Sequence, residues 1–350
     1  MTCLKIWFDI LTPKQVMFFK RAIDLLRGSG RHQVLCTSRR YREAVELAKI
    51  KQLDLTIVGT HGGSDRYDKL RQSSSRTYEL ALIVNEFAPD VAVTFSSPEG
   101  ARVAYGLGIK QFGFNDSPHA EAVARLTLPL LSKLYCPWVV PYTAWTGYGI
   151  ARKDIVSYRA LDPAAWLKHP DRAASENEIS TTILIRLEES KASYMADKRL
   201  RTVEMIDGIV DSLHESAEIA VLCRYEDQIA EVEARYGRKV RVLKQVVDGT
   251  ELVRSAQLFV GAGGTMTAEA ALLGKPTISI TPFQFYVEKY LLRTGLVKKA
   301  ADPKTLVKLA KRMISDEKYQ QLQKKKAARI LGGMEDPTDR MISAINAVRL

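Results

Sequence analysis

Residues 260–276 read VGAGGTMTAEAALLGKP, and this stretch decides the fold. The apolar residues that lead into it predict a buried strand. Gly261, Gly263 and Gly264 predict a tight turn whose backbone can be approached closely. Residues 266–273 are good helix formers, and the glycine and proline that follow predict the end of the helix. The stretch therefore predicts a strand, a glycine turn and a helix, and residues 277–280 start the next strand.

A unit of this kind aims backbone N–H groups and the positive end of a helix at one point, which suits an anion such as a diphosphate. Two known phosphate motifs do not match it. The dinucleotide fingerprint needs a small residue in place of Met266, and the P-loop needs a glycine in place of Glu269 and a Ser or Thr in place of Pro276. The sequence predicts a phosphate-binding loop that belongs to neither class.

Glu269 has an unusual position for a helix-capping residue. A capping box that starts at Thr265 would have its acid at residue 268, which is Ala268. A carboxylate beside an anion site suits the ribose hydroxyls of a nucleotide. A solvated glutamate that is favoured by the helix dipole is the alternative, and the spacing leaves both interpretations open.

Residues 261–276 resemble the C-terminal nucleotide-sugar motif of GT-B enzymes, including UDP-N-acetylglucosamine 2-epimerases and MurG-type N-acetylglucosaminyltransferases. In those enzymes the glycine turn meets the diphosphate, and a glutamate that matches Glu269 binds the ribose. The chain as a whole resembles the archaeal and bacterial DUF354 family, regarded as GT-B-like predicted glycosyltransferases. Further segments that carry this resemblance are residues 7–10 with Pro13, residues 96–98, residues 114–116 with His119, Arg186 with Tyr194, and residues 224–225.

A chain of 350 residues is expected to form two domains. Strands and helices alternate with short connections, which predicts an α/β fold with mostly parallel sheets. The resemblance implies a GT-B-like pair of Rossmann-like, doubly wound domains that face each other across a cleft. We expect an N-terminal acceptor domain in residues 1–150, a connection in 151–178, a nucleotide-sugar-binding domain in 179–330, and a final helix in 331–350 that returns to the first domain.

Composition predicts a cytoplasmic protein. The four cysteines are scattered and show no metal-binding or disulfide spacing, and no apolar run reaches the ~18 residues of a membrane span. The net charge is +12, of which residues 298–329 contribute +8. A solvated helix face is the preferred interpretation of this excess, and the alternative is attraction to a phosphorylated acceptor or to nucleic acid, or peripheral contact with an anionic membrane at its inner face. Nucleic acid is not expected, because only Tyr319 interleaves with the basic residues.

In an open α/β sheet, ligands bind beyond the carboxyl ends of the strands. Polar residues stand at several such ends. Candidate bases for an acceptor proton are Asp9, His61, Asp116 and His119, with Glu99 as a further carboxylate. Asp9 and Asp116 have the alternative role of capping a loop or helix.

Arg186 and Arg224 each follow an apolar strand directly, and a guanidinium offers forked donors to phosphate oxygens. Pairing with a neighbouring glutamate is the alternative. The predicted nucleotide-binding set therefore consists of Arg186, Arg224, Gly261, Gly263, Gly264, Thr265 and Glu269.

The leading hypothesis is a glycosyltransferase that moves a sugar from a nucleotide sugar, in the first instance a UDP-sugar, to a glycan or lipid-linked acceptor. No metal and no tightly bound cofactor are expected, because the chain has no DxD triplet and the resemblance is to metal-free sites. A non-hydrolysing UDP-N-acetylglucosamine 2-epimerase is one alternative. A catalytically silent protein of the same fold that binds anionic lipid or RNA is another.

Overall fold

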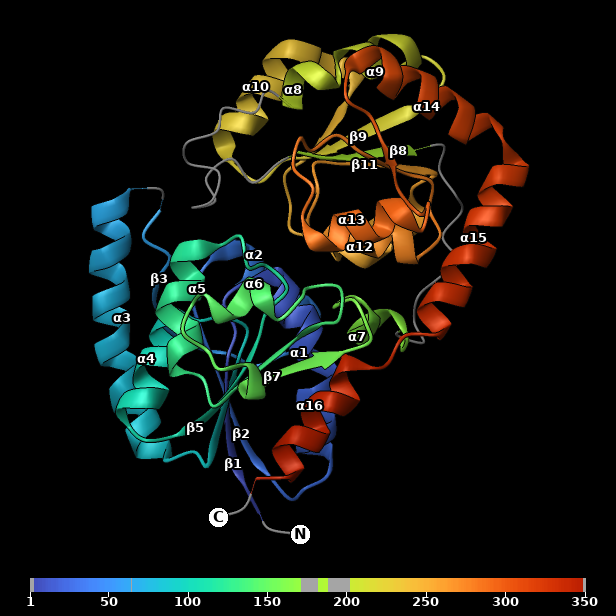
Figure 1. Ribbon diagram of the computed structural model, residues 1–350. Coiled ribbons are helices and arrows are strands. Elements are labelled where there is room, and N and C mark those ends of the chain that lie inside the picture. The colour runs from blue at the N-terminus through green and yellow to red at the C-terminus, as the bar shows by residue number, and fades with distance from the viewer. Residues whose placement is uncertain (1–2, 64, 171–181, 188–201, 349–350) are drawn as a thin grey trace. The chain divides into compact units, whose positions relative to one another are not determined.

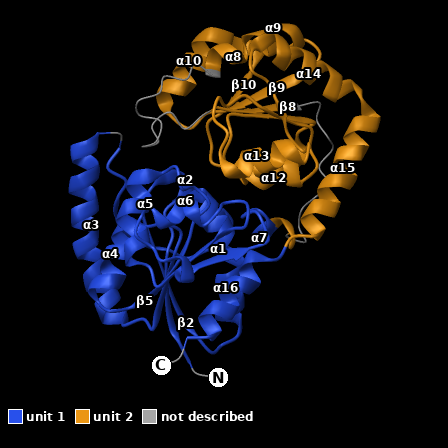
Figure 2. Ribbon diagram, viewed as in Figure 1, with its two compact units in different colours: residues 1–166, 335–350 blue, residues 167–334 orange. Residues whose placement is uncertain are grey.

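The computed structural model describes residues 3–63, 65–170, 182–187 and 202–348. The chain forms two compact units (Figure 2). Unit 1 contains residues 1–166 and 335–350, and unit 2 contains residues 167–334.

Unit 1 is built on a seven-stranded parallel sheet in the order β3-β2-β1-β4-β5-β6-β7 (Figure 1). Its strands are β1 (Lys5–Asp9), β2 (Gln33–Arg40), β3 (Thr56–Thr60), β4 (Val91–Thr94), β5 (Lys110–Phe114), β6 (Lys133–Pro137) and β7 (Ile155–Tyr158). Its helices are α1 (Pro13–Gly28), α2 (Arg42–Ile50), α3 (Arg66–Phe87), α4 (Pro98–Gly106), α5 (Glu121–Thr127), α6 (Thr143–Thr146) and α16 (Pro337–Asn346), with α7 (Ala164–Leu167) at the boundary between the units.

Aromatic packing joins α1 to the sheet of unit 1. Phe18 and Phe19 on α1 are fully buried, and the Phe18 ring lies edge-on to Phe114 of β5, with ring centroids 5.2 Å apart. Phe95, just beyond β4, makes a similar contact with Phe18 at 5.3 Å. Edge-to-face pairs of this kind add to the free energy of burial, so they hold the start of α1 beside the ends of β4 and β5.

Unit 2 is built on a six-stranded parallel sheet in the order β10-β9-β8-β11-β12-β13. Its strands are β8 (Thr182–Arg186), β9 (Glu218–Leu222), β10 (Arg241–Leu243), β11 (Leu258–Gly261), β12 (Thr277–Ser279) and β13 (Lys298–Lys299). Its helices are α8 (Thr202–Met205), α9 (Asp207–Leu213), α10 (Glu226–Tyr236), α11 (Gly249–Ser255), α12 (Thr265–Leu272), α13 (Tyr286–Arg293), α14 (Pro303–Ser315) and α15 (Glu317–Gly332).

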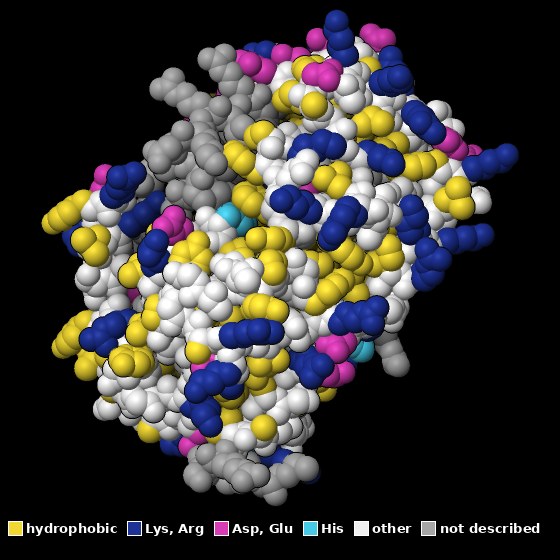
Figure 3. Space-filling view, in the orientation of Figure 1, with side chains coloured by type: hydrophobic (Ala, Val, Ile, Leu, Met, Phe, Trp, Pro, Cys, Tyr) yellow, Lys and Arg dark blue, Asp and Glu magenta, His cyan; other side chains and the backbone are white. Residues whose placement is uncertain are grey.

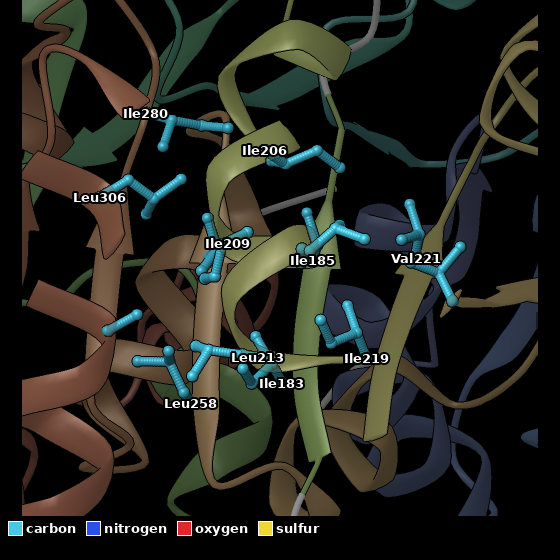
Figure 4. Packing of buried hydrophobic residues seen from close by; sticks show 14 of the residues in the cluster. Ile183, Ile185, Ile206, Ile209, Leu213, Ile219, Val221, Leu258, Ile280 and Leu306 are labelled. Carbon is cyan, nitrogen blue, oxygen red and sulfur yellow. The ribbon is translucent and has the colours of Figure 1, made fainter. Parts of the chain in front are cut away.

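One core cluster of unit 2 lies between this sheet and the helices on one of its faces (Figure 4), and a second cluster, which includes Leu184 and Phe259, covers the other face. Ile183 and Ile185 on β8 point to the same face because side chains alternate along a strand. They pack with Ile206, Ile209 and Leu213 of the α8–α9 segment, and all five side chains are buried. Among the described residues, no helix has the length and apolar character needed to cross a bilayer.

Both sheets are doubly wound, which confirms the predicted α/β class with two Rossmann-like sheets. In each sheet the chain starts in the middle, adds two strands on one side, and then crosses to the other side. The order therefore reverses between β1 and β4 in unit 1, and between β8 and β11 in unit 2. Such switch points leave a crevice at the carboxyl ends of the strands, where ligands bind in this class of fold.

The prediction that residues 151–178 connect the two domains is wrong for residues 155–158, which belong to the sheet of unit 1. Residues 155–158 form β7, which pairs in parallel with β6, and Tyr158 is fully buried. The Pro- and Gly-containing segment before β7 looks like a linker in the sequence, but it forms the compact turns between two paired strands. Residues 171–178, like Tyr194, lie outside the described part of the chain.

The C-terminal residues belong to unit 1, where α16 packs on α1. A backbone bond from Glu335 N–H to Arg159 O, at 3.0 Å, marks the point where the chain rejoins the unit. A carboxylate oxygen of Glu335 also accepts from Arg159 N–H at 2.9 Å. Residues 331–334, which we expected in the returning segment, belong to unit 2.

Asp9 is the last residue of β1, and its carboxylate ties four elements of unit 1 together. Two guanidinium nitrogens of Arg76 on α3 lie 2.6 and 3.1 Å from its two oxygens. Thr37 of β2 donates at 2.7 Å, and Ser97 before α4 donates at 2.5 Å. Asp9 and Arg76 are both fully buried. Both oxygens of Asp9 are thus engaged, which favours the alternative of a carboxylate that holds loops and strands together over the predicted role of base.

The guanidinium of Arg76 makes further contacts besides those with Asp9. Its Nε donates to Val58 O of β3 at 2.9 Å, and its Nη1 lies 3.5 Å from Glu99 Oε2. Burial lowers the pKa of Arg76, but the neighbouring Asp9 carboxylate outweighs burial and leaves that pKa raised. Asp9 and Glu99, two of the carboxylates considered as bases, thus form one buried network with Arg76.

Replacing Asp9 with Asn should destabilise unit 1 strongly, because it leaves the buried Arg76 charge uncompensated. Removing one partner of a buried pair costs about 3–5 kcal/mol. The measurement is urea unfolding followed by tryptophan fluorescence, since all four tryptophans lie in unit 1.

The control is Asp24→Asn, which removes the exposed carboxylate paired with Lys20. Exposed pairs contribute about 0–1 kcal/mol, so this variant should unfold near the wild-type midpoint. An Asp9→Asn protein that unfolds together with the control would show that the network does not hold unit 1 together.

Candidate functional site

The glycine loop of unit 2 leaves the sheet at the switch point between β8 and β11. In the parallel pairing, Gly261 lies beside Arg186 on one side and Ser279 on the other. Ala262 N–H donates to Arg186 O at 3.1 Å, and Ile280 N–H donates to Gly261 O at 2.9 Å. These bonds fix where the loop begins, at the edge of the sheet where ligands bind in this fold class.

The three predicted glycines are required for different reasons. A Cβ on Gly261 would lie 2.5 Å from the Thr267 hydroxyl oxygen, so no larger residue fits there. Gly263 and Gly264 have φ of +92° and +81°, a region that disfavours residues with a Cβ. A Cβ on Gly264 would meet nothing within 4 Å, and this residue is exposed. The turn therefore presents its backbone to open space at Gly264.

Helix α12 starts directly after this turn. Its N-cap is Gly264, not Thr265 as the capping argument assumed, and Thr265 is the first helical residue. No side chain caps the first turn and no acidic residue lies in it. The first N–H groups of a helix have no acceptor within the helix. The start of α12 therefore offers backbone donors and a positive helix end, which together suit an anion.

Thr267, in the first turn of α12, has a buried hydroxyl that faces the backbone of Gly261. Its hydroxyl oxygen is buried and has no hydrogen-bond partner in the described part of the chain, and Thr267 is only 2% exposed. Buried hydroxyls usually have a partner. This unpaired hydroxyl, which lies beside Gly261, was not indicated by the sequence.

Glu269 lies one turn further along α12 and is 4% exposed. Its Oε1 accepts a short hydrogen bond from the hydroxyl of Thr250 on α11. The alternative of a solvated glutamate is therefore wrong. Thr250 was not predicted, since nothing in the sequence links it to a residue 19 positions away.

The two predicted phosphate-binding arginines occupy different places. Arg186 is joined to the glycine loop through its backbone, and its Nη1 donates to Leu222 O at 3.1 Å. Arg224 follows β9, one strand further from the loop, and its backbone N–H donates to Gln228 Oε1 at 3.1 Å. The structure thus brings Arg186 next to the glycine turn and sets Arg224 farther along the same edge.

A partly buried ion pair, Glu288 with Lys299, lies beside the neighbouring strand β12. Glu288 accepts from Ser279 Oγ at 2.6 Å and from Lys299 Nζ at 3.0 Å. Lys299 also donates to Thr281 O, and a Cβ on Gly263 would lie 3.3 Å from the Thr281 side chain. Through Thr281, the ion pair of Glu288 with Lys299 fixes the chain that packs against Gly263. No sequence pattern indicated this ion pair.

A second polar cluster lies in unit 1, around Lys14 at the start of α1. Its Nζ lies 2.6 Å from an oxygen of Asp116 and 2.6 Å from an oxygen of Asp162. Tyr158 donates its hydroxyl to the other Asp162 oxygen at 2.5 Å, and Ser117 Oγ donates to Asp116 at 2.8 Å. One cation thus serves two carboxylates.

The two carboxylates of this cluster differ in pKa. Burial raises the pKa of Asp162 to about 6, although Lys14 opposes the shift. Burial acts in the same direction on Asp116, but the Lys14 charge and the hydrogen bonds to it outweigh burial and lower that pKa. Burial also lowers the pKa of His119 to about 4, against the attraction of Asp116. At neutral pH, Asp116 is ionised and His119 is neutral.

Of the predicted bases, the structure therefore brings Asp116 and His119 into one electrostatic environment and leaves the others out of it. Asp9 belongs to the Arg76 network, and His61 stacks on Tyr41 with ring centroids 5.0 Å apart. The sequence analysis missed Lys14, Asp162 and Tyr158. Lys14 could have been noticed, because a cation in the first turn of a helix opposes the helix dipole.

The chain is similar to known proteins along its whole length. The protein described as uncharacterized protein MJ0665, from Methanocaldococcus jannaschii, is 26% identical over 364 residues, which cover 98% of this chain and 98% of that protein.

Three of the solved structures with a similar fold illustrate the likeness. The UDP-GlcNAc 2-epimerase of Neisseria meningitidis bound to UDP-GlcNAc has a TM-score of 0.74 at 12% identity, and covers 98% of this chain and 100% of that one. The M. jannaschii UDP-GlcNAc 2-epimerase in complex with UDP-GlcNAc and UDP has a TM-score of 0.71 at 16% identity, and covers 98% of this chain and 99% of that one. The spinosyn forosaminyltransferase SpnP has a TM-score of 0.66 at 16% identity, and the match covers 99% of each chain.

At these identities the likeness establishes the fold, which epimerases and GT-B glycosyltransferases have in common. The family model described as "Protein of unknown function (DUF354)" matches residues 4–348, and the chain therefore belongs to the DUF354 family.

Proposed function

We propose that this protein is a nucleotide-sugar-dependent enzyme, and in the first instance a glycosyltransferase that uses a UDP-sugar. The observation that carries the proposal is the start of α12, where an exposed glycine turn leads into a helix with an uncapped first turn. A buried carboxylate, Glu269, lies one turn behind it. The named ligands of the similar epimerases, UDP and UDP-GlcNAc, support the choice of nucleotide.

In this proposal the diphosphate accepts hydrogen bonds from the backbone of the turn and from the first turn of α12. The guanidinium of Arg186 or Arg224 supplies a positive charge. Glu269, oriented by Thr250, accepts hydrogen bonds from the ribose hydroxyls. Donors that are already in place when negative charge develops on the leaving diphosphate stabilise the transition state.

The proposal assigns the chemistry of the acceptor to unit 1. Transfer of a sugar to a hydroxyl needs a base that removes the hydroxyl proton. Asp116 and His119 are the candidates, because the first is ionised and the second is neutral at pH 7. Lys14 positions Asp116 and keeps it ionised.

Epimerisation is the second candidate, and one observation favours it. Asp116 and Asp162 share Lys14, yet their pKa values shift in opposite directions. Carboxyl groups whose pKa values are pushed apart in this way are typical of sites where one group takes a proton and another gives one. A 2-epimerase needs such a pair to remove and return the proton at C2 of the sugar.

UDP should bind to the wild-type protein, and Glu269→Gln should weaken binding by about 10- to 100-fold. The loss of one hydrogen bond to a charged group, about 1.5–3 kcal/mol, sets this range. Isothermal titration calorimetry measures both constants. Glu251→Gln, an exposed glutamate on α11, is the control and should bind UDP like the wild type. If no nucleoside diphosphate binds to the wild-type protein, the proposed function is wrong.

Asp162 should titrate near pH 6 in the folded protein, and Tyr158→Phe should raise its pKa further, because the lost hydrogen bond favours the charged form. NMR of protein labelled at the aspartate Cγ measures this pKa. Since the folded-state pKa is raised, Asp162 costs stability as pH rises from about 4 to 6, and the full cost remains above that range.

Tyr135→Phe is the control for this titration, because the buried Tyr135 ring stacks on Phe114 and its hydroxyl makes no hydrogen bond to Asp162. That variant should leave the Asp162 titration in place. A titration of Asp162 near its ordinary pKa would remove the basis for an acid and base pair on Lys14.

The two reactions differ in the fate of the proton at C2. With UDP-N-acetylglucosamine in deuterated water, a transferase should release UDP only when an acceptor is present and should leave C2 unlabelled. Asp116→Asn should then slow UDP release by about 100-fold or more, as expected for the loss of a general base. Mass spectrometry of the recovered sugar nucleotide decides between the candidates, because deuterium at C2 would identify an epimerase.

A further inference from the structure

Helices α14 and α15 of unit 2 carry a large excess of positive charge. Together they contain nine Lys or Arg residues and one acidic residue, Glu317. In the space-filling view, Lys and Arg side chains gather on the side of the molecule where α15 runs (Figure 3). The charge therefore has a definite place on the surface and is not spread evenly over unit 2.

Each helix separates its cations from its buried side. On α14, Leu306, Ala310 and Met313 are buried, and Lys304 and Lys308 are exposed. Residues three or four positions apart share one side of a helix, so Lys304, Lys308 and Lys311 form a row on the side opposite the core.

On α15 the buried residues are Gln323 and Ala327. Lys318, Lys325 and Arg329 are exposed and spaced so that they form a second row. Leu322 lies in this row and is 64% exposed. We call these exposed side chains the lysine face, which consists of Lys304, Lys308, Lys311, Lys318, Leu322, Lys325 and Arg329.

The cations of the lysine face have no carboxylate partners among the described residues, where no Asp or Glu oxygen lies within 4.0 Å of them. Lys299, in contrast, belongs to the same basic segment but turns inward to Glu288. The predicted segment 298–329 is therefore not uniform: Lys299 is paired, and the lysine face on the two helices presents charge without a carboxylate partner in the described part of the chain.

The pKa of a neighbouring lysine, Lys275, is lowered in part by the positive charge of α15. Lys275 has a pKa lowered to about 8, first through burial and then through the charges of Lys324 on α15 and Arg254. Unpaired like charges on one surface repel each other and lower stability. A partner that supplies negative charge relieves this repulsion.

We propose that the lysine face of α14 and α15 docks this protein on an anionic lipid bilayer. Clusters of four to eight Lys or Arg on an amphipathic helix are typical of surfaces that bind anionic lipid headgroups. Leu322 among the cations favours a bilayer over a polyanion in water, because only a bilayer offers it an apolar environment.

Single-stranded nucleic acid fits the face less well. Proteins that bind it combine positive charge with exposed aromatic rings on which bases stack. The one aromatic residue of α14 and α15 is Tyr319, which is half-buried and accepts a hydrogen bond from Gln323 at 2.7 Å. The lysine face therefore lacks an exposed stacking platform.

The test is flotation of the full-length protein with vesicles of phosphatidylcholine, with and without phosphatidylglycerol. Wild-type protein should float only with the anionic vesicles, and less at high salt. The variant Lys318→Glu, Lys325→Glu, Arg329→Glu should reduce the partition coefficient by about 100-fold or more, since each basic residue near an anionic surface contributes about 1 kcal/mol.

A matched control separates the lysine face from net charge. Lys49→Glu, Lys110→Glu, Lys153→Glu changes the same number of exposed lysines or arginines in unit 1 and should float like the wild type. Equal losses in the two triple variants, or equal flotation of both with the wild type, would overturn the proposal.

The variant Leu322→Gln tests the apolar contact with the bilayer, because it leaves the charge of the lysine face unchanged. It should weaken binding to anionic vesicles by roughly tenfold, because burial of a leucine side chain contributes about 1.5–3 kcal/mol when complete. It should leave binding to single-stranded RNA unchanged. If RNA binds more tightly than anionic vesicles at the same salt concentration, the lysine face is a nucleic-acid surface and the proposal is wrong.

Discussion

The parallel pairing of β8, β11 and β12 is the constraint on which the candidate nucleotide site depends. It sets Arg186, Gly261 and Ser279 side by side at one edge of the sheet. Because the order of the strands reverses between β8 and β11, nothing in the sheet covers the chain as it leaves β11. The glycine turn and the start of α12 then follow in a fixed direction, and the donors of the helix end face the space beyond the sheet.

Unit 1 contains two clusters of charged side chains, one around Asp9 and one around Lys14, and they differ in how the carboxylates are neutralised. Asp9 accepts hydrogen bonds from Arg76 and from two hydroxyl donors, so its carboxylate holds elements of unit 1 together. Lys14, in contrast, serves two carboxylates at equal distances. A single positive charge is shared by the half-buried Asp116 and the buried Asp162, and the pKa values of the two carboxyl groups shift in opposite directions. Of the two, Asp162 has its pKa raised to about 6, which brings it closer to neutral pH.

Local patterns predicted the fold class well and the domain limits less well. Alternating apolar strands and helices are sufficient to indicate parallel sheets, because their connections must cross a sheet face. The strand at residues 155–158 was missed because proline and glycine residues before it indicated a linker. Its assignment depends on pairing with β6, and pairing between strands is not visible in the local sequence.

The sequence by itself determined the strand, the glycine turn and the helix at residues 258–272, because positive φ angles and helix propensity are properties of single residues and their neighbours. It also determined where polar residues follow strands. Only the tertiary structure decided the partners of those residues: Arg76 reaches Asp9 across 67 positions, and Lys14 meets Asp116 and Asp162 through the packing of α1 on the sheet. Such contacts depend on the order of the strands, which no local pattern contains.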